Sequence, residues 1–131
     1  MKLRLSGQSI RFRLLRSEVV QLIERGRVQE SLFLGPEDSD TLSYALETDA
    51  QAAEMKMRHS NGEIAVLLPY GLAKTWADTE QVGLYATMNM EGNRSLDLIV
   101  EKDFACLDLS DADNEDTFPN PPGRRNLLRS A

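Results

Sequence analysis

Hydrophobic and polar residues alternate with a period of two along most of this chain, which is typical of β-strands with one buried face. The clearest case lies near the N-terminus, where Ile10, Phe12 and Leu14 alternate with Arg11 and Arg13. Similar alternation predicts about eight strands, near residues 2–5, 10–14, 28–34, 41–47, 55–59, 64–68, 82–90 and 96–101. Short strands joined by hairpin turns favour an antiparallel sheet.

The strongest turn signal is Asn61-Gly62, a pair typical of the type I′ turn of a two-residue hairpin. Such a loop fixes the register of the two strands that it joins. The predicted pairs on the apolar side are His59 with Ile64, Met57 with Val66, and Met55 with Leu68. Those on the mixed side are Arg58 with Ala65 and Lys56 with Leu67.

One helix is predicted over about residues 17–25, after the second strand. Ser17 is a suitable N-cap, because its hydroxyl can accept a hydrogen bond from an unpaired amide of the first turn. Gly26 can adopt the left-handed conformation that ends a helix. Leu72, Ala73 and Trp76 indicate a further short helical turn.

These elements predict an α+β fold that is mostly β: an antiparallel curled sheet or open barrel of about eight strands with one helix. We expect a single β-rich domain over residues 1–110. Residues 111–131, which include the proline-rich stretch 118–122, are expected to form an extended or partly disordered tail. No internal repeat of solenoid length is visible.

The 131 residues carry a net charge of −6, which is unevenly distributed. Residues 1–16 carry +5, residues 17–102 carry −8, residues 103–116 carry −6, and residues 117–131 carry +3. The basic head and the acidic late segment could attract each other within one chain or between two. The acidic balance argues against nucleic-acid binding. No apolar run suits a membrane helix or a secretory signal, so we expect no membrane association and a cytoplasmic location.

Few residues suit catalysis or metal binding. One cysteine and one histidine exclude an intrachain disulfide and a zinc site of several thiolates or histidines. His59 flanks a turn, and Cys106 lies in an apolar stretch where a structural role is expected. The segment from Asp111 to Glu115 starts like a calcium loop but lacks its glycine and final glutamate. No nucleotide-binding motif occurs, and no cofactor is expected.

The remaining candidates are cations on alternating strand positions: Lys2, Arg4, Arg11, Arg13, Lys56 and Arg58. If they point inward, they would line a cavity suited to phosphate or carboxylate groups. If they point outward, they only protect strand edges from unwanted pairing. The other interpretation of these six residues is a site for an anion or an acidic partner. The alternation favours the outward arrangement, because Ile10, Phe12 and Leu14 need the core.

Three groups of residues resemble a family of small bacterial proteins of unknown function. They are residues 1–4 with 9–14 and 17–19, residues 42–46, and residues 101–107 with 118–121. The resemblance covers residues 1 to about 121. It implies a cytoplasmic bacterial protein and brings no activity, cofactor or site residue.

The function expected is therefore a non-enzymatic module that binds a protein partner or associates with itself. The alternative is binding or hydrolysis of a small phosphate-rich polyanion in a cationic barrel cavity, as in the triphosphate-tunnel proteins. The E-x-E-x-K opening of those proteins is absent from this chain.

Overall fold

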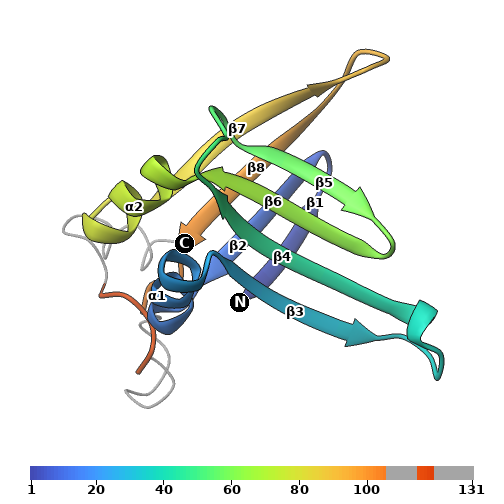
Figure 1. Cartoon of the computed structure of the whole chain (residues 1–131), viewed down its shortest axis with the longest axis horizontal. Coiled ribbons are helices and arrows are strands. Elements are labelled where there is room, and N and C mark those ends of the chain that lie inside the picture. Colours follow the sequence, from blue (N-terminus) through green and yellow to red (C-terminus); the bar gives the residue numbers. More distant parts are fainter. Residues whose placement is uncertain (106–114, 120–131) are drawn as a thin grey trace, which may run out of the picture.

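The computed structural model describes residues 1–105 and 115–119. These residues form eight strands, two α-helices and one short 3-10 helix at Asp38–Asp40 (Figure 1). The strands are β1 (Lys2–Ser6), β2 (Ser9–Leu14), β3 (Arg27–Phe33), β4 (Thr41–Asp49), β5 (Lys56–Ser60), β6 (Glu63–Pro69), β7 (Gly83–Met90) and β8 (Arg94–Lys102). The helices are α1 (Arg16–Arg25) and α2 (Tyr70–Asp78).

The strands form two four-stranded sheets, with the orders β1-β2-β8-β7 and β3-β4-β6-β5. The α+β, mostly β class is confirmed, and so is the register of the β5–β6 hairpin. The predicted single antiparallel, curled sheet or barrel with one helix is wrong, because the described residues form two sheets and two α-helices. Both sheets are mixed, because β2 pairs with β8 and β4 pairs with β6 in parallel. The reason is that α1 carries the chain from one sheet to the other. β2 and β3 therefore lie in different sheets, and β2 pairs with β8 instead of β3.

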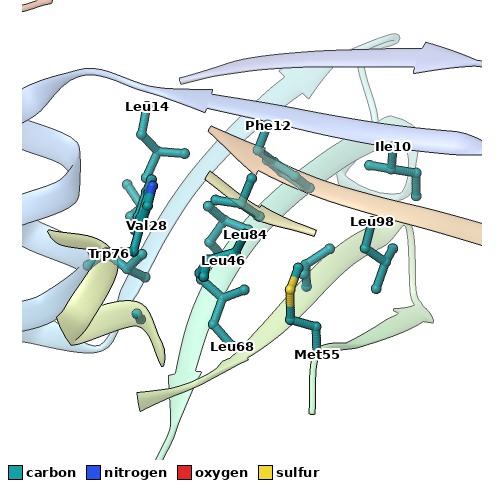
Figure 2. Close-up of a cluster of buried hydrophobic side chains, with 14 of the residues drawn as sticks. Ile10, Phe12, Leu14, Val28, Leu46, Met55, Leu68, Trp76, Leu84 and Leu98 are labelled. Carbon is teal, nitrogen blue, oxygen red and sulfur yellow. The ribbon is translucent and has the colours of Figure 1, made fainter. Parts of the chain in front are cut away.

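The core lies between the two sheets and is apolar (Figure 2). Phe12 from one sheet points toward Leu46 from the other. Phe12, Leu46 and Leu68 are fully buried. Full burial of each such side chain contributes roughly 1.5–3 kcal/mol. In the part of the chain that the structure describes, this space is filled with apolar side chains rather than with the candidate cations.

The two helices lie side by side at one end of the sheets and close that end of the core (Figure 1). α1 begins at Arg16, with Leu15 as its N-cap. The prediction of Ser17 as N-cap is therefore wrong. Instead the carboxylate of Asp116 accepts hydrogen bonds from the amide of Ser17 (3.0 Å) and from its hydroxyl. A residue of the late acidic segment thus completes the helix start, and Gly26 ends the helix as expected.

The fold is built from two similar halves, β1-β2-α1-β3-β4 and β5-β6-α2-β7-β8. Ser9 pairs with Asp97 in one sheet and Glu63 with Ser43 in the other, so both positions move by 54 residues between halves. The same shift relates Leu22 to Trp76, both fully buried on their helices. Each sheet therefore contains one hairpin from each half. This repeat has few sequence identities, chiefly the Lys-x-Arg-x-Ser of β1 and β5.

Candidate functional site

The six candidate cations lie on two different surfaces. Lys2, Arg4, Arg11 and Arg13 share the outer face of the β1-β2-β8-β7 sheet, opposite the buried side of β2. Lys56 and Arg58 lie on the outer face of the other sheet. The structure therefore does not bring all six together. In the repeat, Lys56 and Arg58 are the counterparts of Lys2 and Arg4.

The four residues of the first sheet form a compact group, here called the basic face. Lys2 stands opposite Arg13 and Arg4 stands opposite Arg11, so each cation has another as its cross-strand neighbour. Side chains opposite one another in an antiparallel pair have Cβ atoms only about 4.5–5.5 Å apart. Like charges at this distance repel, so nearby anions stabilise the arrangement.

The compensating anions are few. The Glu101 carboxylate lies 3.4 Å from Nε of Arg11 and 4.0 Å from Nε of Arg13, and it accepts a hydrogen bond from the Tyr85 hydroxyl (2.8 Å). Asp103 lies 3.0 Å from Nζ of Lys2, which is 71% exposed. Within the described ranges, Arg4 forms no ion pair.

The contact between Lys2 and Asp103 bears on the opposite charges of the two chain segments. It joins the basic head to the first residue of the acidic late segment within a single chain. Because the Lys2 side chain is largely exposed, this contact contributes under about 1 kcal/mol, and the basic face stays open to other anions.

On the equivalent face of the second sheet, arginines and glutamates pair with each other. Arg27 contacts Glu47 and also Glu63 (2.7 Å), while Arg58 contacts Glu47 (3.0 Å) and Glu63 (3.5 Å). Each arginine thus contacts both glutamates, and the four side chains form a closed ring of ion pairs. A hydrogen bond from Arg58 lowers the pKa of Glu47 and, from the other side, raises the pKa of Arg58. We call these four residues the charge ring.

The outer faces of the two sheets differ in charge because equivalent positions of the two halves carry different residues. Ala45 and Ala65 lie beneath the charge ring and are fully buried, so the arginine side chains can lie flat across them. The counterpart of Ala65 on β2 is Arg11, and that of Leu67 is Arg13, from the shift of 54 residues. The first sheet therefore gains two arginines where the second has apolar side chains.

A second charged cluster joins the two sheets. The α-amino group of Met1 contacts carboxylate oxygens of Glu18 on α1 and of Glu30 on β3 (2.9 Å to Glu30), and Tyr44 donates its hydroxyl to Glu30 (2.7 Å). Burial works against the charged amino group, yet its two carboxylate partners raise its pKa above the ordinary value. Burial likewise opposes the charge of Glu30, but these partners lower its pKa.

Tyr44 completes this cluster from β4. Its hydrogen bond to Glu30, with burial, raises the pKa of Tyr44 to about 12. The cluster thus ties β1, α1 and the β3–β4 hairpin together. Sequence reasoning missed it, since no spacing rule relates an amino terminus to positions 18, 30 and 44.

Lys102 is the buried cation at the end of β8, with 5% of its surface exposed. Its ammonium group donates to the carbonyl of Thr79, just after α2 (2.6 Å), and lies 5.3 Å from the Phe118 ring centre. Burial lowers the pKa of Lys102. The position beside the C-terminal end of α2 gives this residue a structural role.

Other candidates gain no support. His59 is exposed at the end of β5, on the other sheet from the basic face. Cys106, Asp111 and Asp113 lie outside the described residues, as does most of the predicted tail. No group of three metal-binding side chains occurs in residues 1–105 and 115–119. The described helices include none that is long and apolar enough to cross a membrane.

Comparison with known proteins places the chain in a family. Residues 1–122 match the family of unknown function DUF7009, and the chain belongs to that family. The resemblance predicted from the sequence is thus confirmed as to family. No curated protein and no solved structure matches the chain.

Proposed function

We propose that this protein is a non-enzymatic binding module whose basic face recognises an acidic segment of a partner protein. One observation carries the proposal. The two similar halves of the fold form a closed charge ring on one sheet but an open group of four cations on the other. A surface held only for solubility has no need of this difference.

The chemistry of the basic face suits carboxylates. Arginine offers a planar set of donors that matches a carboxylate, and such charge-assisted hydrogen bonds are among the stronger ones. Arg11 and Arg13 lie two residues apart on one strand, which corresponds to about 6.6 Å. An extended peptide has the same repeat. The preferred ligand is therefore an extended segment with Asp or Glu at alternate positions.

The surroundings of the basic face favour binding over catalysis. Its polar neighbours include Asp103, Glu101 and Tyr85, and the last two form a hydrogen bond with each other. The lone histidine, His59, lies on the other sheet. The proposal keeps the cytoplasmic bacterial setting that the family resemblance implied.

A labelled peptide of alternating glutamate and serine tests the proposal directly. The double substitution Arg4→Gln/Arg13→Gln is expected to weaken binding at least ~10-fold at low salt, and added salt should weaken the wild type more steeply than the variant. The matched control, Lys56→Gln/Arg94→Gln, removes the same charge elsewhere and should change the affinity less than ~2-fold. Equal losses in both variants would show a general charge effect and contradict a defined site.

The alternative ligand is a small phosphate-rich anion. It would have to bind on the open basic face, because apolar side chains fill the space between the sheets. Inorganic triphosphate added as a competitor separates the two ligands. Displacement of the peptide at micromolar triphosphate would favour the small anion, whereas a protein ligand predicts that only millimolar concentrations compete.

A further inference from the structure

The two sheets end in four edge strands, β1, β7, β3 and β5. An edge strand exposes unpaired backbone groups, and proteins commonly protect it with charged residues or proline. β1 carries Lys2 and Arg4, β5 carries Lys56 and Arg58, and β3 carries Arg27 and Glu30. β7, with the sequence GLYATMNM, has no charged residue and no proline over eight residues.

The hydrogen-bond pattern shows which groups of β7 face outward. Lys102 donates its amide to Val82, and Asp97 donates its amide to Gln8 on the opposite side of β8. Even-numbered residues of β8 therefore point their backbone groups toward β7, and they pair with even-numbered residues of β7. Thr87 and Asn89 consequently direct their N–H and C=O groups away from β8.

We propose that β7 pairs antiparallel with β7 of a second copy of this chain, about a two-fold axis at Met88. Thr87 of each copy then exchanges backbone hydrogen bonds with Asn89 of the other. The two Met88 side chains face each other on the core side of the sheet. Met88 is half-buried and packs against the core, and its flexible thioether side chain adapts to such a contact.

A second copy fits this edge because an uncharged strand can pair with an identical strand without charge repulsion. On the outer side Thr87 and Asn89 present polar groups, and on the core side the contact is methionine against methionine. The same self-pairing of β1 or β5 would bring like charges together. The dimer joins two sheets into one of eight strands and displays both basic faces on the same side.

Sedimentation velocity over a concentration series tests this pairing. The wild-type chain is expected to form a dimer. Asn89→Pro removes one outward N–H without touching the β7–β8 bonds, and since two symmetry-related hydrogen bonds disappear, the dimer Kd should rise about 10- to 30-fold. Asn89→Ala keeps the amide and should dimerise like the wild type. Circular dichroism verifies that both variants remain folded.

Cross-linking locates the interface independently of folding stability. In a Cys106→Ser background, Met88→Cys is expected to give a covalent dimer on oxidation. Leu32→Cys, which lies on the charged edge strand β3, should give none. A wild-type chain that stays monomeric up to ~1 mM, or a dimer that Asn89→Pro does not weaken, would overturn the proposal.

Discussion

Glu47 and Glu101 occupy equivalent positions in the two halves of the fold, and each carboxylate contacts two arginines of its sheet. Glu47 shares its arginines with a second carboxylate, Glu63, in a closed ring. Glu101 has Arg11 and Arg13 on one side and the Tyr85 hydroxyl on the other. One template thus yields a neutral face and a basic face.

Glu101→Gln should strengthen binding to the basic face. The carboxylate of Glu101 competes with an incoming acidic ligand for Arg11 and Arg13, so its removal frees both arginines. We expect the affinity for the alternating glutamate peptide to rise about 3- to 10-fold at low salt, measured by fluorescence anisotropy. The control is Asp78→Asn, which removes a negative charge from α2 and should leave the affinity nearly unchanged. Weaker binding by Glu101→Gln would contradict this role.

Glu47→Gln should destabilise the second sheet modestly. The substitution leaves Arg27 and Arg58 with only Glu63 to share, at a surface that solvent reaches, so the loss is about 1 kcal/mol. Because the pKa of Glu47 is lowered in the fold, this contribution is present above the ordinary pKa of 4.5 and disappears as pH falls through the folded value. Urea unfolding at neutral and acidic pH measures the difference, which should vanish in acid.

Glu30→Gln probes the cluster at the amino terminus. Glu30 is 41% exposed, so its loss should cost no more than about 1 kcal/mol. Its lowered pKa makes the contribution disappear as pH falls below 4.5. The raised pKa of the Met1 amino group makes it disappear as pH rises above 8.0. The stability difference from the wild type should therefore be largest between these values. A difference independent of pH would argue against the ion pair, and Tyr44→Phe should have a smaller effect.

Lys102→Met tests whether the buried ammonium group stabilises the fold. The methionine keeps an apolar stem but loses the donor to Thr79, and since it also removes a buried charge, we expect a net change within about 1 kcal/mol. Lys102→Ala, which also loses the stem, should cost about 2 kcal/mol. Because burial lowers the pKa of Lys102, wild-type stability should rise relative to Lys102→Met as pH approaches 10.5. Thermal unfolding across alkaline pH checks the sign.

Cutting the chain between its halves tests the repeat. We expect fragments 1–51 and 52–131 to remain largely unfolded when alone, because each holds two separate hairpins and isolated hairpins are marginal in water. Mixed in equal amounts, they should restore the far-ultraviolet circular dichroism of strands. If either fragment showed native-like signal by itself, the two sheets would not depend on both halves as the topology indicates.

Local sequence patterns predicted the individual elements well. The alternation of Ile10, Phe12 and Leu14 identified a strand with one buried face, and Asn61-Gly62 set the register of β5 and β6. These predictions succeed because side-chain alternation and turn geometry depend on neighbouring residues. The N-cap of α1 was predicted wrongly. The carboxylate that accepts from the amide of Ser17 belongs to Asp116, which is 99 residues away in the chain.

The candidate site was predicted only in part. The pattern placed Lys2, Arg4, Arg11 and Arg13 on one hairpin face, and the structure has them there. It also grouped them with Lys56 and Arg58, which the fold puts on the other sheet. The charge ring depends on Arg27 and Glu63, and neither stands out in the sequence. Which carboxylates meet which arginines follows from strand order rather than from spacing along the chain.

The sequence alone determined the strands, the first helix and the outward cations, because each depends on local periodicity. Tertiary structure decided the rest: that β2 lies parallel to β8 and β4 parallel to β6, and that the two halves share both sheets. Such pairings join positions far apart in the chain, and many strand orders bury a given set of apolar faces equally well. Only the packing of all the elements together selects one of them, and with it the charges that stay open to a partner.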